Sequence, residues 1–532
     1  LNKVLKKKPL HPVHHFRIHL WDYKNPKAAL NSAARCGQGS PSIAHMWHMP
    51  GHIYSRLKRY EDAVWQMEAS ARTDHAHMMR DRVMPDQIHN FAHNNEWLIR
   101  NMIYIGRVDD AVALAKNMIE LPRHPKYNTA TRRGSSRYGR MRLFQVLLTY
   151  ELWDDLIALS NGPHLEPTTS KTEQFKRLQY LGLAYAITGK KKEANEVIAQ
   201  LEKEAAKPKE PKTAPVKDRK PTKDKKPTKG KKTGSTSRGP SSSSKAKKAI
   251  SVIRGYLALH EKKYGLALEL LRTGGEDRYR QALAQVLAGK KDEALKSIQS
   301  MVSSKTNQVH PHAVLAYVQW SAGKKKEAIA TFDKMRKMSG SIQLGSPVFA
   351  RLAPIAKAMK LPEDWRIERK MPKDVGKRPD LDALGPLRWQ PMPAPEWTLL
   401  DSQDKPRSLK DYRGKPVLVI FYLGYGCLHC AEQLQAFIPK AEEFRDQGIE
   451  MIAISSDNQT GLKRSQDQYK LGKIPFPLVS DEKLEIFKKY RAYDDFEKTP
   501  LHGTFLIDGS GRVRWQDISY EPFMNAQFVL GE

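Results

Sequence analysis

Two patterns of apolar and polar positions divide this 532-residue chain. Up to about residue 365, Ala-rich apolar stretches with helical spacing alternate with short charged turns, as in "YLGLAYAITGKKKEA" (180–194) and "YRQALAQVLAGKKDEA" (279–294). From Trp389 onward, apolar runs of strand length alternate with an amphipathic stretch. The first pattern predicts stacked helical hairpins, and the second predicts an α/β domain with a central sheet.

The charged turns repeat a short motif. "GKKDEA" at Gly289 and "GKKKEA" at Gly323 begin 34 residues apart, which is the period of the tetratricopeptide repeat (TPR), a helix–turn–helix unit. Related turns occur at three earlier places: "RYEDA" at Arg59, "GRVDDA" at Gly106 and "GKKKEA" at Gly189. One helix pair cannot bury its own apolar face, so neighbouring pairs must stack. We therefore predict TPR-like helical repeats over 1–204 and 249–365.

Two segments without periodicity separate these parts. Residues 205–248 are rich in Lys, Pro and Ser, and over 207–248 Val216 is the only branched aliphatic residue. Such a segment buries too little apolar surface to offset its ordering entropy, so we predict a disordered linker. A shorter linker is expected at 366–388. The net charge of +33 owes much to the first linker, which we interpret as a solvated spacer rather than an anion-binding arm. Because it lacks aromatic residues that could stack on bases, we expect no specific nucleic-acid partner.

The last part of the chain, 389–532, contains the signals of a sheet. We predict buried strands at 415–424 and 449–457, one amphipathic helix at 430–448 and a hairpin at 504–515. Asp508 should begin the hairpin turn.

Two of the three cysteines, Cys427 and Cys430, form a C-x-x-C pair where the first buried strand gives way to the helix. Unpaired N–H groups and the positive end of the dipole stabilise a thiolate at a helix start. We predict that Cys427 attacks and that Cys430 resolves the mixed disulfide, with His429 as a positive neighbour. The other interpretations are a zinc site, which wants four ligands, and a structural disulfide, whose loop is too short to stabilise much.

The stretch "DYRGKPVLVIFYLGYGCLHCAEQL", followed by "IEMIAISSD", "FPLVSD" and "HGTFLIDGSGRVRW", resembles the AhpC/TSA redoxins of the thioredoxin superfamily. The resemblance implies a thioredoxin-like fold and an antioxidant-type oxidoreductase with no cofactor besides the cysteine pair. Peroxiredoxins of this group carry Pro-x-x-x-Thr-x-x-Cys, but the corresponding residues before Cys427 are Ile420 and Gly424. Thiol–disulfide oxidoreductases carry C-x-x-C and a facing cis-Pro, and that position falls on His502.

The dithiol therefore favours thiol–disulfide exchange over peroxide reduction. A non-catalytic TPR scaffold with a degenerate redoxin domain is a third hypothesis. His502, facing the dithiol, could shuttle a proton or have no task. We interpret Tyr425 as a packing residue and Cys36 as a loop thiol.

Histidines are concentrated in the first hundred residues. They form three i,i+4 pairs that could converge on a metal ion: His15 and His19, His48 and His52, and His89 and His93. Pro50 suggests that the second pair spans a helix start. The alternative is a row of histidines that bond to backbone and carboxylates inside a repeat groove. The stretch "HMPGHIYSRLKRYEDA" resembles a bacterial TPR family, which implies a protein partner but no activity.

Compartment is only weakly indicated. The sequence begins at Leu1, so we expect a fragment, and no apolar run approaches the ~18 residues of a membrane span. Related dithiol redoxins often work outside the cytoplasm, which weakly favours an extracytoplasmic location.

Overall fold

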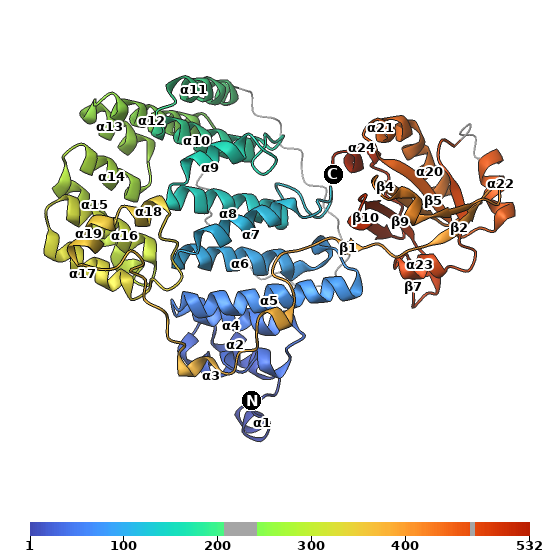
Figure 1. Ribbon diagram of the computed structural model, residues 1–532, viewed down its shortest axis with the longest axis horizontal. Coiled ribbons are helices and arrows are strands. Elements are labelled where there is room, and N and C mark those ends of the chain that lie inside the picture. The colour runs from blue at the N-terminus through green and yellow to red at the C-terminus, as the bar shows by residue number, and fades with distance from the viewer. Residues whose placement is uncertain (207–241, 469–473) are drawn as a thin grey trace, which may run out of the picture. The chain divides into compact units, whose positions relative to one another are not determined.

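The computed structural model describes residues 1–206, 242–468 and 474–532. The chain divides into two compact units, one formed by 1–146 with 368–532 and the other by 147–367. The fold class is the expected one, helical repeats followed by a thioredoxin-like domain (Figure 1). Most of the predicted linker, 207–241, lies outside the described residues, and the helix α12 (Ser242–His260) begins within its predicted last residues.

The first unit opens with helices. They are α1 (Asn2–Lys7), α2 (His14–Trp21), α3 (Leu30–Ala33), α4 (Ala44–Arg56), α5 (Tyr60–Asp81), α6 (His89–Ile105), α7 (Val108–Glu120) and α8 (Ser135–Tyr150), whose last residues belong to the second unit. Pro50 lies inside α4 rather than at a helix start, so His48 and His52 share one continuous helix, contrary to expectation. Cys36 lies in the turn after α3, in a loop as expected, and its side chain is fully buried with Ile18 and Met46 in the core of this unit. Burial raises its pKa to about 12.

Over its described residues, the second unit contains helices and their connecting turns. Its helices are α9 (Trp153–Ser160), α10 (Lys171–Ile187), α11 (Lys191–Ala206), α12, α13 (Tyr264–Gly274), α14 (Arg278–Leu287), α15 (Lys291–Ser304), α16 (Val309–Ser321), α17 (Lys325–Arg336), α18 (Pro347–Ala350) and α19 (Ala353–Ala358).

The repeated charged turns are where one helix ends and the next begins. The glycine of each of the four Gly turns has a positive φ: 82° at Gly106, 76° at Gly189, 75° at Gly289 and 79° at Gly323. A residue in this left-handed conformation ends a helix, and glycine adopts it without steric cost. In "RYEDA" the residue before the motif, Lys58, plays the same part with φ 58°. The motif therefore marks hairpin turns as the sequence indicated.

Residues 368–388 have little regular structure but pack on the helices of their own unit. Arg59 binds both carboxylate oxygens of Asp374, at 2.7 and 2.8 Å. A Cβ on Gly376 would lie 2.0 Å from the Ala34 carbonyl oxygen, so only glycine allows this close approach. The segment thus crosses the helices in direct backbone contact.

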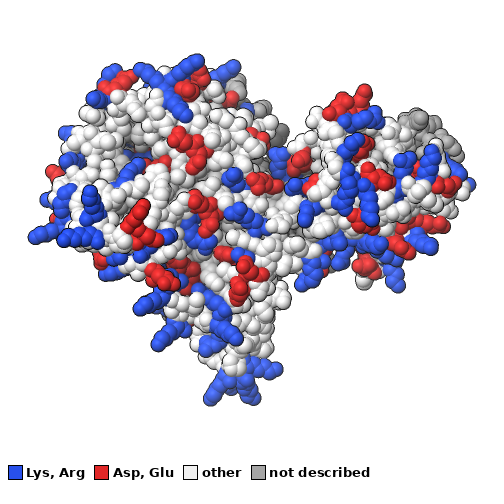
Figure 2. Space-filling model, in the orientation of Figure 1, with Lys and Arg blue, Asp and Glu red and all other residues white. Residues whose placement is uncertain are grey.

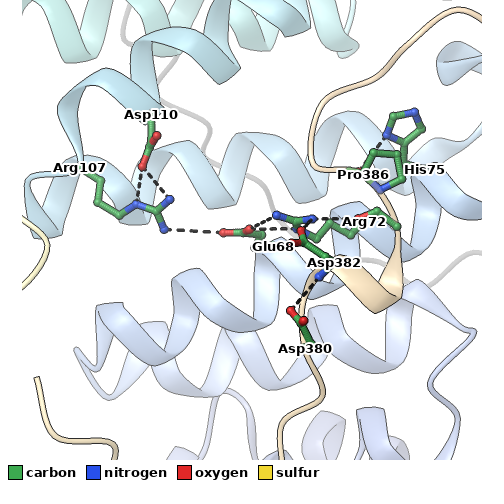
Figure 3. A network of polar contacts seen from close by, with 9 residues as sticks. Glu68, Arg72, His75, Arg107, Asp110, Asp380, Asp382 and Pro386 are labelled. Atoms are coloured by element: carbon green, nitrogen blue, oxygen red, sulfur yellow. Dashed lines mark hydrogen bonds and ion pairs between the residues drawn. The ribbon is translucent and has the colours of Figure 1, made fainter.

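A second set of ionic contacts holds the same segment against α5 (Figure 3). Arg72 bridges Glu68 on its own helix, at 2.9 Å, and Asp382 of the segment, at 2.8 Å. His75 is bonded to the Pro386 carbonyl oxygen, at 2.9 Å. These contacts join residues about 310 positions apart in the chain.

The C-terminal domain is built on one eight-stranded sheet with the order β1-β10-β9-β4-β5-β6-β2-β3. The strands are β1 (Met392–Pro393), β2 (Thr398–Asp401), β3 (Pro406–Ser408), β4 (Val417–Tyr422), β5 (Glu450–Ser455), β6 (Leu478–Ser480), β9 (His502–Ile507) and β10 (Arg512–Ser519). A separate pair is formed by β7 (Tyr493–Asp494) and β8 (Thr499–Pro500). β4, β5 and β6 are parallel, and β9 runs antiparallel to β4.

Helices cover both faces of this sheet: α20 (Leu428–Phe437), α21 (Ala441–Asp446), α22 (Gln459–Gln468), α23 (Glu485–Lys489) and α24 (Ala526–Leu530). Every residue of β4 is buried, and its side chains alternate between two cores. Leu418, Ile420 and Tyr422 join the core under α20, α21 and α24. The predicted single helix 430–448 is broken, because Pro439 lies in a short 3₁₀ turn (Ile438–Lys440) between α20 and α21.

The predicted hairpin is confirmed as β9–β10. The Asp508 carboxylate accepts the backbone N–H groups of Ser510 and Arg512, each at 3.0 Å, so it shapes the turn as expected.

Basic and acidic side chains are interspersed over most of the face shown in Figure 2, so this face offers mixed charge rather than a continuous basic track. Among the helices of the described residues, none combines the length and apolar character that crossing a bilayer would need.

Candidate active site around the dithiol

The loop after β4 places the cysteine pair at the first turn of α20. Gly424 and Gly426 have φ of 96° and 94°, a conformation that glycine adopts readily. The Asp457 carboxylate, after the end of β5, accepts the backbone N–H of Tyr425 at 2.6 Å. A Cβ on Gly424 would lie 2.3 Å from that carboxylate, so the loop and Asp457 fit only with glycine here.

The two thiols have different surroundings. Cys427 is the N-cap residue of α20 and is partly exposed, whereas Cys430 is fully buried, and neither forms a disulfide. Burial, reinforced by the hydrogen bond with Cys427, raises the pKa of Cys430 well above its usual range. The Leu423 backbone N–H contacts the Cys430 sulfur at 3.1 Å. Cys427 is thus the accessible thiol and Cys430 the protected one.

His502, the first residue of β9, lies beside both thiols. Its Nε2 is 3.3 Å from the Cys430 Sγ and 3.9 Å from the Cys427 Sγ. Its Nδ1 is 2.8 Å from the Tyr520 carbonyl oxygen. Because a carbonyl only accepts, Nδ1 carries the proton and Nε2 of the neutral ring presents its lone pair to the sulfurs. Burial lowers the pKa of His502, so the neutral ring is the favoured form.

His429, predicted as a positive neighbour of the thiolate, has a solvent-exposed side chain. Its side chain is 57% exposed and its Nδ1 is 3.2 Å from the Glu432 carboxylate, one turn further along α20. Its ring therefore pairs with a surface carboxylate.

Three exposed apolar side chains belong to the segments around the thiols. Leu428 is 72% exposed, Tyr425 is 40% exposed and Tyr520 is 63% exposed. Tyr425 is therefore a surface residue, not the packing residue expected. Exposed apolar groups next to an accessible thiol are suited to contact with another polypeptide.

Sequence reasoning missed Asp457 and the Tyr520 carbonyl. The first had a signal, because "SSD" follows a predicted parallel strand next to the one that leads to the dithiol. The second had none, since a backbone carbonyl 18 residues from His502 leaves no mark in the sequence.

The histidine candidates group differently from the expected pairs. Ligand atoms of His15, His19 and His45 lie within 4.8 Å of one another, and so do those of His48, His52 and His93. The His89 side chain lies outside the described residues. Cys427, Cys430 and His502 meet the same 4.8 Å criterion, although a zinc ion there would still want a fourth ligand.

Comparison with known proteins identifies the C-terminal region. Residues 392–516 match the AhpC/TSA family. The chain is 36% identical over 132 residues to a protein of Clostridium pasteurianum described as a peroxiredoxin of the rubredoxin operon, covering 23% of this chain and 74% of that one. It is also 36% identical over 121 residues to the chloroplastic peroxiredoxin Q of Sedum lineare, covering 23% of this chain and 63% of that one. Peroxidoxin BcpB from Mycobacterium tuberculosis has a similar solved structure, with 19% identity, a TM-score of 0.24 and coverage of 26% of this chain and 92% of that one.

Proposed function

Because this chain belongs to the AhpC/TSA family and is a thiol-dependent oxidoreductase by that membership, we propose that Cys427 and Cys430 transfer electrons to substrate disulfides. The observation that carries the proposal is the position of one histidine nitrogen beside both sulfurs, at 3.3 and 3.9 Å. One base can then deprotonate the attacking thiol and afterwards the resolving thiol.

The first step uses the exposed thiol. His502 Nε2 takes the proton of Cys427, and the thiolate at the start of α20 attacks one sulfur of the substrate disulfide. The substrate S–S bond breaks as the bond between Cys427 and substrate forms. The departing substrate thiolate receives the proton held by His502.

The second step uses the buried thiol. Cys430 passes its proton to the same nitrogen, 3.3 Å away, and its sulfur attacks the Cys427 sulfur. The mixed disulfide breaks, the second substrate sulfur leaves as a thiol, and a Cys427–Cys430 disulfide remains. The substrate has gained two electrons and two protons, and a dithiol reductant must return them to the enzyme.

Trapping the mixed disulfide tests this order. The Cys430→Ser variant should accumulate an adduct at Cys427 with a disulfide-containing substrate such as native insulin, visible on a non-reducing gel and cleared by dithiothreitol. The Cys427→Ser variant should form none, and Cys36→Ser, which removes a buried thiol outside the site, should behave as wild type. An adduct that forms equally well at Cys430 alone contradicts the assigned order.

Peroxide reduction is the second candidate, favoured by relatives described as peroxiredoxins. The Cys427 thiolate would attack the peroxide O–O bond to give a sulfenic acid and release an alcohol or water. Cys430 would then form the disulfide with loss of water. Hydrogen peroxide consumption measured beside insulin reduction, at equal enzyme concentration, separates the two activities.

We also propose that the repeats recruit the protein substrate. In the second unit, a cavity of about 290 Å³ is lined by Tyr256, Tyr317, Arg280 and Arg351 among others, a mixture of aromatic and cationic groups that suits a peptide segment. Tyr317→Ala should then lower the yield of adducts that Cys430→Ser traps from a cell extract, while insulin reduction stays unchanged. Equal yields with the same adduct bands would oppose recruitment through this cavity.

A further inference from the structure

Six histidines form a continuous row on the N-terminal helices of the first unit. They come from three helices: His15 and His19 from α2, His45, His48 and His52 from α4, and His93 from α6. The His45 and His48 rings stack with centroids 5.6 Å apart, which joins the two triads into one row. Positions 45, 48 and 52 are three and four apart, so α4 presents them as one stripe.

The inner triad consists of His48, His52 and His93. The His48 ring lies 4.5 Å from the His52 ring and 5.1 Å from the His93 ring, between centroids. His48 is only 3% exposed, yet among the described residues its Nδ1 has no hydrogen-bond partner, and the same holds for the Nε2 of His52. A buried nitrogen without a partner is unfavourable, and a metal ion would satisfy such a lone pair.

A carboxylate stands behind this triad. The Asp22 Oδ2 lies 3.6 Å from the His52 Nδ1, and Arg56 fixes the other oxygen of Asp22 at 2.5 Å. Metal-binding histidines commonly direct their second nitrogen toward such a carboxylate, which orients the ring. This arrangement leaves the His52 Nε2 as the nitrogen for a ligand.

We propose that His48, His52 and His93 bind one Zn²⁺ ion through three imidazole nitrogens and leave a fourth position open. Zn²⁺ accepts three histidine ligands in a tetrahedral arrangement, and the ligand atoms already lie within 4.8 Å of one another. The outer triad suits an ion less well. His15 and His19 already share a hydrogen bond of 3.0 Å between their Nε2 atoms, and that pair is exposed.

The test uses the full chain after removal of metals with a chelator. Zn²⁺ is titrated by calorimetry, and Co²⁺ is used as a visible probe of tetrahedral coordination. We expect one ion per chain, and a loss of affinity of at least 100-fold in both His52→Gln and His93→Gln. Asp22→Asn, which changes only the group behind the site, should weaken binding by about 10-fold to 100-fold.

Two matched controls accompany these variants. His19→Gln alters the outer triad, and His312→Gln alters a buried histidine in the second unit; both should bind as wild type does. Circular dichroism shows whether the inner variants fold. If they do not, X-ray absorption spectroscopy of the zinc-loaded wild type tests the proposal instead, and we expect three imidazole ligands on the zinc ion. The absence of a one-to-one binding isotherm, a first shell without imidazoles, or affinity lost in His19→Gln but kept in His52→Gln would overturn the proposal.

Discussion

Replacing His502 with glutamine should remove the base that serves the dithiol. The side chain remains polar and of similar reach, but it has no basic nitrogen. General-base catalysis contributes typically 10²–10⁴-fold. We expect the lower end, because the His502 Nε2 is 3.9 Å from the Cys427 Sγ and Cys427 is partly open to water, which is an alternative proton acceptor. Reduction of insulin at pH 7 should therefore slow about 100-fold, equivalent to about 2.7 kcal/mol of activation free energy.

The pH dependence gives this prediction its sharpest form. Burial lowers the pKa of His502, so the ring is the neutral base at neutral pH and becomes protonated only as the pH falls below its ordinary range near 6.5. Wild-type activity should thus persist into mildly acidic buffer and then decline. In His502→Gln the rate should instead rise steadily toward alkaline pH, as the thiol ionises without help, and approach the wild-type rate there.

The assay is iodoacetamide alkylation of Cys427 between pH 5 and 10 in a Cys36→Ser background, quantified by peptide mass spectrometry. His429→Gln is measured in parallel, since the sequence offered His429 as the charged neighbour. Superimposable profiles for wild type and His502→Gln would refute the role of His502. A large loss of Cys427 alkylation rate in His429→Gln alone would indicate that the exposed His429, and not His502, promotes ionisation of Cys427.

Two further predictions concern stability. Gly424→Ala should cost about 1–3 kcal/mol, because φ is 96° and the new Cβ would lie 2.3 Å from Asp457; a melting temperature equal to that of wild type would show that the loop adjusts freely. Burial raises the pKa of Asp74 to about 7, only partly offset by its hydrogen bond from Asn94. The folded state therefore holds a proton that the unfolded state releases near pH 3.9, so stability should fall between about pH 4 and 7, by up to about 4 kcal/mol. Asp74→Asn should flatten this slope in urea unfolding at pH 5 and pH 8, and an unchanged slope would assign it to other groups.

Local signals in the sequence predicted local structure well. The strand β4 could be predicted from its continuous apolar run, because a strand that is buried on both faces has no alternation of apolar and polar residues. The glycines of the turns could be predicted because a residue with a left-handed backbone conformation is needed where one helix ends and the next begins directly. Pro439 was a local signal that was underused, since proline interrupts a helix and here divides α20 from α21.

Contacts between distant segments could not be predicted from the sequence. The i,i+4 spacing predicted the histidine pairs on α2 and on α4, but the packing of the helices determines which histidines from different helices come together. His45, three residues before His48, joins α2 in the outer triad, while His93 joins α4 in the inner one. The packing of 368–388 on α5 likewise depends on Arg72 meeting Asp382, a pairing that neither segment's composition indicates.

The geometry at His502 also bears on which oxidant the site accepts. The two leaving groups differ in basicity. A departing cysteine thiolate is the conjugate base of a thiol with a pKa near 8.5, whereas a departing hydroxide is the conjugate base of water, whose pKa is 15.7. The leaving oxygen of a peroxide therefore needs a stronger proton donor than the leaving sulfur of a disulfide needs. In the resting site the His502 Nε2 is an acceptor and its Nδ1–H is already donated to the Tyr520 carbonyl. The only proton that this ring can give is the one it has just taken from a thiol. One shared proton is sufficient for a sulfur leaving group, which supports the disulfide exchange proposed above. Peroxide turnover that exceeded disulfide turnover would require a second donor near Cys427.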